Sequence, residues 1–241
     1  MRKIYHSNRN TFMIIKDEPK NLEYLISNID GIIFIDKILN NTVFFDLFNR
    51  DGSRAEVSGN GLACLTYLLS KLLKYQEYIL INSFFPDKVF YSKVLENEII
   101  VGFDLSYVRV EEIIIASDKM YRLSIPNPHI VFPMFQSKED RAIKKAEEIY
   151  NYFKKSINVH AFDVSRMYMY TFERGVGWTE SCGSGAIACA YIYQNLLSNN
   201  TQHFVLTIRS QGGEIKITIE NNTYWMSSNP HEIQEESISM L

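Results

Sequence analysis

Two short segments of the chain combine a small nucleophilic side chain with glycines at the start of an apolar helical run. They are Ser58-Gly59-Asn60-Gly61 and Cys182-Gly183-Ser184-Gly185, about half the chain length apart. The first backbone N–H groups of a helix have no partner within it and carry partial positive charge, so each start suits an anion. The pair predicts a clamp on one carboxylate, with a side chain from each segment on either side of the neighbouring carbon. That arrangement suits transfer of a proton from one face of this carbon to the other.

The two segments differ in the residue that would do the chemistry. Cys182 stands at a predicted helix start, which is expected to lower the pKa of its thiol and to make the thiolate available. Ser58 offers a hydroxyl, which is a far weaker acid and needs an adjacent base. Cys64 and Cys189 fall inside apolar helical runs and are expected to be packed thiols.

Composition excludes several classes of function. The chain has 241 residues, a net charge of −3 and 46% hydrophobic residues, which is ordinary for a soluble globular protein. It has no basic footprint for nucleic acid and no apolar run long enough to span a bilayer. Three cysteines without short spacing argue against a disulfide framework or a zinc site. The segment from Met1 to Arg9 lacks the apolar core of a signal peptide, so we expect a cytoplasmic protein. The sequence has no visible motif for a metal, pyridoxal phosphate or a nucleotide, so we expect no metal or cofactor.

Hydrophobic periodicity divides the chain into two similar halves. Helices are predicted over 62–75, 139–156 and 186–197. Strands are predicted over 43–48, 78–81, 89–94, 99–103, 121–125, 158–164, 167–172, 205–209 and 214–219, and residues 113–116 are expected to cross between the halves. Each half combines strands with one central helix that begins at one of the two motifs. We predict an α/β (α+β) protein with two domains, 1–115 plus 229–241 and 116–228, that face each other across an active cleft.

Two long segments resemble the catalytic motifs of the diaminopimelate epimerase family. The first runs from Asp51 to Gly61 and the second from Glu173 to Gly185. Shorter segments that follow the family order are His6–Phe12, Pro126–His129, Ile157–Val159 and Gln211–Gly213. The resemblance covers nearly the whole chain. It implies two pseudosymmetric domains, each a curved mixed sheet around a central helix.

This resemblance also implies an activity. The family carries out cofactor-independent epimerisation of LL-2,6-diaminopimelate to the meso form, on the route to lysine and peptidoglycan. One thiolate removes the α-proton, and the opposite thiol delivers a proton to the other face. Carried over by position, Cys182 is one acid/base and Ser58 stands where the family has its other cysteine, with Glu173 and His129 as assisting residues. The implied partner is a small amino acid, and a homodimer is implied by resemblance alone.

Substrate-binding residues follow from the same resemblance. The α-carboxylate would be held by backbone at Gly59, Asn60, Gly183 and Ser184. The distal end of diaminopimelate would be read by Asn10, Asn49, Asn127, Asn158 and Arg174. Arg174 suits a carboxylate because its planar guanidinium can bond bidentately. The remaining histidines are interpreted as surface or packing residues: His6, His160, His203 and His231.

Ser58 is the main departure from the family pattern, because a hydroxyl in place of a thiol breaks or severely slows a two-base cycle. Three explanations stay open: an engineered Cys→Ser form, a natural homologue with altered chemistry, and an inactive relative. Trp178, beside the second motif, replaces a usually acidic residue and leaves the substrate open. The alternatives are therefore a racemase of the same fold that acts on another amino acid, such as histidine, and a non-catalytic amino-acid-binding protein.

Overall fold

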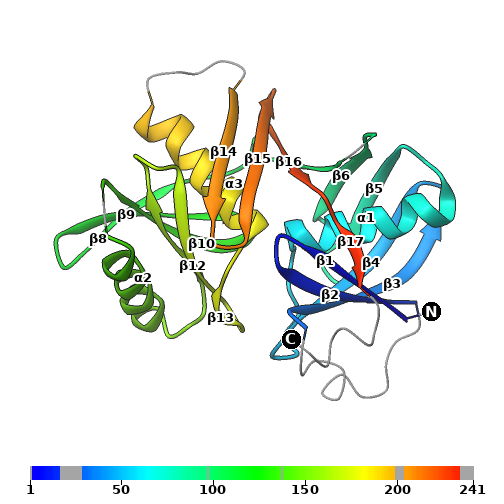
Figure 1. The fold of residues 1–241 in the computed structure, drawn as a ribbon, viewed down its shortest axis with the longest axis horizontal. Coiled ribbons are helices and arrows are strands. Elements are labelled where there is room, and N and C mark those ends of the chain that lie inside the picture. Colours follow the sequence, from blue (N-terminus) through cyan, green and yellow to red (C-terminus); the bar gives the residue numbers. More distant parts are fainter. Residues whose placement is uncertain (1, 17–28, 97, 137, 199–203, 234–241) are drawn as a thin grey trace. The chain divides into compact units, whose positions relative to one another are not determined.

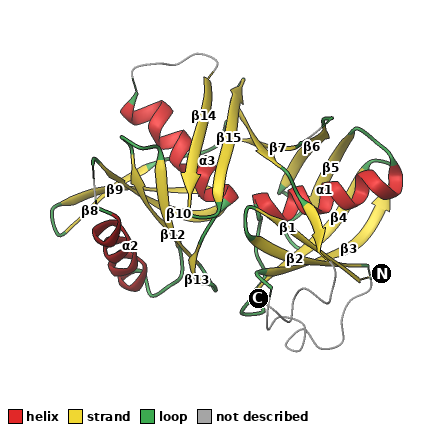
Figure 2. Cartoon of the chain, in the orientation of Figure 1, coloured by secondary structure: helices red, strands yellow, loops and turns green. Residues whose placement is uncertain are grey.

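The structure is a computed structural model that describes residues 2–16, 29–96, 98–136, 138–198 and 204–233. Figure 1 gives the order of the elements, and Figure 2 shows that strands make up most of the regular structure. The chain forms two compact units, Met1–Gly102 with Ser227–Leu241 (unit 1) and Phe103–Met226 (unit 2). Strands β7 (Ile99–Asp104) and β16 (Thr223–Ser228) carry the chain from one unit to the other.

Unit 1 is a mixed sheet with one central helix, α1 (Gly59–Leu73). Its strands are β1 (Arg2–Ser7), β2 (Asn10–Ile15), β3 (Gly31–Leu39), β4 (Thr42–Asn49), β5 (Glu77–Asn82), β6 (Val89–Val94) and β17 (His231–Ile233). Along the chain, the pairing from β1 to β6 alternates antiparallel, parallel, antiparallel, parallel and antiparallel. Helix α1 packs against β1, β2, β3 and β6.

The sequence explains where α1 forms and where it ends. Leu62, Leu65 and Leu69 recur at helical spacing and are almost fully buried. Ser58 caps the first turn, and Lys74 ends the helix in the left-handed conformation at φ 60°. The helix therefore begins three residues before the predicted span of 62–75 and stops two residues before its end.

Unit 2 repeats this plan around α3 (Gly183–Ile192), which continues as a π-helical turn over Tyr193–Leu197. Its strands are β8 (Glu111–Ile115), β9 (Asp118–Ile125), β10 (Asn127–Met134), β11 (Asn158–Asp163), β12 (Tyr168–Glu173), β13 (Gly177–Thr179), β14 (Phe204–Ser210) and β15 (Gly213–Glu220). The pairing of β9, β10, β11, β12, β14 and β15 alternates as it does from β1 to β6. Helix α3 contacts β9 to β12, β14 and β15.

A second helix of unit 2, α2 (Glu139–Tyr152), packs against β11 and β12. Its apolar stripe of Ala142, Ala146 and Ile149 joins a core with Val159 and Phe172. The amphipathic pattern predicted this helix, although it ends at Tyr152 rather than at 156. It thus packs against β12, which ends at Glu173, the first residue of the second motif.

The predicted fold class is confirmed, because both units are mixed sheets around a central helix and the pairing order is repeated. The hairpin of β14 and β15 also matches the prediction. Residues 113–116 do not cross between units, because β8 pairs with β9 inside unit 2. The contacts thus group residues 103–115 with unit 2, whereas the sequence assigned them to the first domain. Of the C-terminal segment 229–241 assigned to the first domain, residues 234–241 lie outside the described residues.

Candidate active site

The predicted site residues fall into two groups, one in each unit. Unit 1 contains Asn10, Asn49, Ser58, Gly59 and Asn60. Unit 2 contains Asn127, His129, Asn158, Glu173, Arg174, Cys182, Gly183 and Ser184. Each group includes the first residues of its central helix.

Ser58 is the N-cap of α1, in an extended conformation with φ −135° and ψ 118°. Its hydroxyl accepts a hydrogen bond of 3.1 Å from the N–H of Gly61, which satisfies one of the unpartnered groups of the helix start. A Cβ added at Gly61 would lie 3.1 Å from Phe12 and 3.3 Å from Ile33, so apolar side chains support this turn. Among the described residues of unit 1, no carboxylate or imidazole bonds to Ser58 and could activate its hydroxyl.

A buried amide network fixes the first turn of α1. The Nδ2 group of the fully buried Asn60 donates to Oδ1 of Asn10 at 2.6 Å. Its Oδ1 accepts from Nδ2 of Asn8 at 3.1 Å. Asn49 instead donates to Oγ of Ser53 at 3.0 Å, inside its own loop. The structure therefore brings Asn10 and Asn60 together, whereas the Asn49 amide is bonded locally.

Cys182 is the N-cap of α3 and has nearly the same backbone conformation as Ser58, with φ −143° and ψ 111°. Its Sγ accepts from the N–H of Gly185 at 3.3 Å and lies 3.7 Å from Oγ of Ser184. The side chain is only 2% exposed. Gly183 and Ser184 are also buried, so unit 2 builds its helix start in the same way as unit 1.

The expected lowering of the Cys182 pKa is wrong. Burial raises the pKa of this thiol well above its ordinary value, and the nearby carboxylate of Glu173 raises it further through its charge and a hydrogen bond. The Ser184 hydroxyl and the Gly185 N–H act in the opposite direction but are outweighed. Cys182 is therefore a protonated thiol next to a carboxylate. Burial likewise raises the pKa of Cys64 and Cys189, which are packed thiols as predicted.

His129 belongs to a buried hydrogen-bonded chain. Its Nδ1 lies 2.8 Å from Nε2 of His160, whose Nδ1 lies 3.1 Å from Oγ1 of Thr171. Burial lowers the pKa of His129 to about 3, and the positive charge of Arg174 contributes, while the Ile125 carbonyl opposes the shift. The Nε2 atom of His129 has no hydrogen-bond partner among the described residues.

The other predicted residues of unit 2 lie at strand ends near the start of α3. Oδ1 of Asn158, the first residue of β11, accepts from the backbone N–H of Arg174 at 2.8 Å. Oε1 of Glu173 accepts from Oγ1 of Thr179 at 2.7 Å. Asn127, the first residue of β10, is 7% exposed. The structure thus joins Asn158 to Arg174 and places Glu173 close to the Cys182 thiol.

Sequence analysis missed the partners of His129. It assigned His160 to the surface or to packing, but this ring is fully buried and hydrogen-bonded at both nitrogens. A histidine inside the continuous apolar run of β11 was the available signal, because a buried polar group needs partners. Thr171 could not be identified without the pairing of β11 with β12. The ring centroids of His6 and His231 lie 4.9 Å apart. His203 lies outside the described residues.

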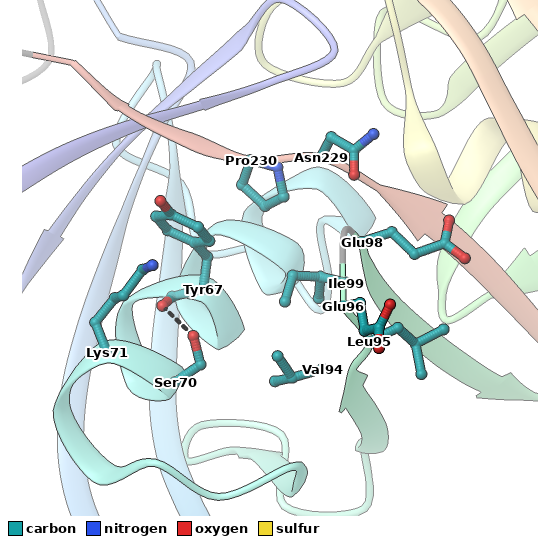
Figure 3. A pocket seen from close by; sticks show the side chains of 10 residues that line it. All are labelled: Tyr67, Ser70, Lys71, Val94, Leu95, Glu96, Glu98, Ile99, Asn229 and Pro230. Atoms are coloured by element: carbon teal, nitrogen blue, oxygen red, sulfur yellow. Dashed lines mark hydrogen bonds between the residues drawn. The ribbon is translucent and has the colours of Figure 1, made fainter.

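A cavity of about 210 Å³ in unit 1 lies away from the helix start. Figure 3 shows Tyr67, Ser70 and Lys71 of α1 on one side and the segment from Val94 to Ile99 on another. These α1 residues belong to the later turns of the helix, whereas Ser58 caps its first turn. None of the predicted site residues lines this cavity.

In the part of the chain that the structure describes, no helix is long and apolar enough to cross a membrane. Described histidine, cysteine, aspartate and glutamate side chains do not gather in any group of three or more that could hold a metal ion.

Comparison with known sequences identifies relatives of one kind. The family model described as diaminopimelate epimerase matches residues 122–231. Diaminopimelate epimerase from Thermotoga maritima is 25% identical over 252 residues, which cover 96% of this chain and 99% of that protein. The enzyme of the same name from Enterococcus faecalis is 24% identical over 84% of this chain and 72% of that protein.

Solved structures share the fold at low sequence identity. A predicted epimerase from Pseudomonas aeruginosa has a TM-score of 0.72 at 12% identity, over 97% of this chain and 96% of the other. A hydroxyproline epimerase from Agrobacterium vitis, with bound trans-4-hydroxy-L-proline, has a TM-score of 0.68 at 11% identity, over 97% and 90%. The named relatives are isomerases, as the sequence motifs predicted. The chain is thus similar in sequence to diaminopimelate epimerases and has the fold of amino-acid epimerases and racemases.

Proposed function

We propose that the chain binds LL-2,6-diaminopimelate and exchanges the proton on its α-carbon without a cofactor, as an epimerase with serine at one acid–base position. The repeated helix start carries this proposal. Ser58 and Cys182 hold the same capping position and accept from the N–H of the third residue along. A reaction that uses both faces of one carbon needs two such positions.

Cys182 is the proposed acid–base for one face. Its thiol is protonated in the free protein because burial and Glu173 raise its pKa. The Glu173 carboxylate takes the thiol proton when substrate binds, and the resulting thiolate removes the proton from the α-carbon. The sulfur then holds the proton taken from the α-carbon. If this proton exchanges with solvent, directly or through Glu173, before the same sulfur returns a hydrogen to the same face, the result is exchange without inversion.

Ser58 limits the opposite face. Delivery of a proton there requires a group that gives and regains it readily, and a serine hydroxyl needs an adjacent base for this. The hydroxyl of Ser58 accepts from the Gly61 N–H, and no carboxylate or imidazole among the described residues of unit 1 bonds to it. We therefore propose that inversion by the two-base route is impaired while binding is retained.

Diaminopimelate is the proposed substrate because the residues that match its distal recognition set are all present. We propose that backbone at Gly59, Asn60, Gly183 and Ser184 binds the α-carboxylate, and that the distal end is read by Asn10, Asn49, Asn127, Asn158 and Arg174. The sequence relatives named diaminopimelate epimerase support this substrate. By the resemblance of its motifs, we also propose a cytoplasmic role in the route to lysine and peptidoglycan, with a homodimer as the proposed assembly.

A second candidate substrate is favoured by Trp178. Its ring is 37% exposed and packs on Phe172 with centroids 5.4 Å apart, beside the turn that carries Arg174. Such a ring would suit an amino acid with a flat side chain, such as histidine. A binding protein without turnover is favoured by a different observation: among the described residues of unit 1, no base bonds to Ser58.

Cα proton exchange in heavy water separates these functions. The native protein, without added cofactor, is incubated with LL-diaminopimelate or with L-histidine, and deuterium at the α-carbon is followed by NMR. We expect incorporation into diaminopimelate, with little change of configuration, and none into histidine. Exchange into histidine alone would transfer the proposal to a histidine racemase. Tight binding of diaminopimelate by calorimetry without any exchange would establish the binding protein.

A further inference from the structure

His129, His160 and Thr171 are linked by hydrogen bonds. The distances between their heavy atoms limit which ring nitrogens can carry hydrogen. All three side chains are at most 1% exposed. Burial keeps the pKa of both imidazoles well below its usual value, so each ring is neutral and has one N–H. Nδ1 of His129 and Nε2 of His160 lie 2.8 Å apart, which is a hydrogen-bond distance, so one of the two rings places its hydrogen between these atoms.

The position of this hydrogen depends on Thr171. Its hydroxyl has one hydrogen-bond partner among the described residues, Nδ1 of His160. If His160 donated to Oγ1, the buried hydroxyl hydrogen would have no acceptor, which is costly. If the hydroxyl donates, it is satisfied, and the proton of His160 must lie on Nε2. The donor without a described partner is then Nε2–H of His129, which a bound substrate would satisfy in the proposed function.

We infer that Thr171 donates to Nδ1 of His160, that Nε2–H of His160 donates to Nδ1 of His129, and that His129 therefore presents an Nε2–H donor to the site. His160 and Thr171 are positioning residues that set this tautomer. In the proposed function, on which this last step rests, His129 stabilises negative charge on the substrate by hydrogen bonding and does not remove a proton.

The corresponding positions of unit 1 indicate that the hydrogen bonds among His129, His160 and Thr171 are not needed to support the fold. When β2 and β10 are matched at their first residues, Asn10 and Asn127, Phe12 corresponds to His129. The strand register then matches Ile33 to His160 and Leu47 to Thr171. These three unit 1 residues are apolar and buried. A mixed sheet of this topology therefore supports its helix start with hydrophobic side chains, and the polar set of unit 2 requires another explanation.

The tautomer can be measured without turnover. Nitrogen-15 NMR of the full chain, labelled at histidine, distinguishes a protonated from an unprotonated ring nitrogen, and His129→Gln assigns the His129 signals. We expect the Nε2–H form of both His129 and His160 at neutral pH. The Nδ1–H form of both rings would overturn the inference.

A matched pair of variants tests the role of the hydroxyl. Thr171→Val keeps the shape but removes the donor, so we expect His160 and His129 to become mixtures of tautomers, seen as averaged nitrogen shifts. Thr171→Ser keeps the donor and should retain the native shifts. Unchanged shifts in folded Thr171→Val would overturn the role of Thr171. If Thr171→Val does not fold, the native spectrum still decides the tautomer.

The two levels of the proposal fail separately. Native Nε2–H tautomers without any Cα exchange would overturn the proposed function but leave the proton arrangement established. Cα exchange with Nδ1–H tautomers would do the reverse.

Discussion

The starts of α1 and α3 are built alike but supported differently. Each begins with a capping side chain that accepts from the third N–H, and each has glycine at the first and third helical positions. In unit 1, Phe12 and Ile33 lie against Gly61. In unit 2, the ring of His160 lies so close to Gly185 that an added Cβ would be 2.2 Å from its Cε1.

This difference distinguishes residues that only support a helix start from residues that could take part in a reaction. The position that corresponds to Glu173 in unit 1 is Asn49, because the register pairs Asn49 with Gly31 of β3. Unit 1 thus lacks both the carboxylate and the imidazoles that surround the start of α3. Unit 1 buries uncharged amides at its helix start, whereas unit 2 buries titratable groups, a thiol and two imidazoles, beside its own. Titratable groups in such surroundings are candidates for proton transfer, so we infer that this step of the proposed function depends mainly on unit 2.

Among the variants that compare the two helix starts, Cys182→Ala is expected to have the largest effect. Because it removes the only thiol at a helix cap, we expect Cα exchange to fall by roughly 10²–10⁴-fold, the usual contribution of a general acid–base group. Ser58→Ala is the matched control and should retain exchange within a few-fold. Heavy-water NMR with diaminopimelate measures both rates. Equal losses in the two variants would show that the halves contribute alike.

Arg174→Ala sharpens the comparison at the distal end of the substrate. Loss of a charged hydrogen-bonding partner should weaken diaminopimelate binding by about 1.5–3 kcal/mol in calorimetry. Arg50 follows Asn49 as Arg174 follows Glu173, but it is ion-paired to Asp30 at 2.8 Å. Arg50→Ala should therefore leave binding nearly unchanged. The same loss for an amino acid with a single carboxylate would remove Arg174 from distal recognition.

Gly185→Ala and Gly61→Ala compare the supports of the two helices. An alanine at 185 must displace the hydrogen-bonded His160 ring, so we expect a loss of about 1–3 kcal/mol of unfolding free energy. At 61 the nearest contacts are 3.1–3.3 Å, and small shifts accommodate the methyl group. Denaturant unfolding measures the pair. A larger loss at 61 than at 185 would contradict the described packing.

Glu173→Gln tests the smallest effect, the titration of one thiol. Because the negative charge of Glu173 raises the pKa of Cys182, removal of that charge should move thiolate formation to lower pH. Ultraviolet absorbance of the thiolate, with Cys182→Ala as the blank for Cys64 and Cys189, follows this shift. A titration that moves to higher pH would show that the carboxylate does not act on the thiol through its charge.

Much of the fold could be predicted because the signals are local. The leucine spacing of α1 and the two Gly-rich motifs determine the central helices and their starts. The prediction missed eight strands: β1, β2, β3, β8, β10, β13, β16 and β17. Strand β2, for example, is buried throughout and has no alternation to reveal it. The prediction for the pKa of Cys182 was wrong for a different reason. A helix start lowers a thiol pKa, but burial and Glu173 depend on three-dimensional packing that the motif does not encode.

The stereochemistry of exchange in Ser58→Cys tests the central claim most directly. With LL-diaminopimelate in heavy water, we expect the native chain to exchange the α-proton with retention of configuration. The variant, which restores a thiol at both caps, should exchange with inversion and form the meso isomer. A native chain that inverts as fast as Ser58→Cys, or a variant that binds diaminopimelate without inverting it, would contradict the account.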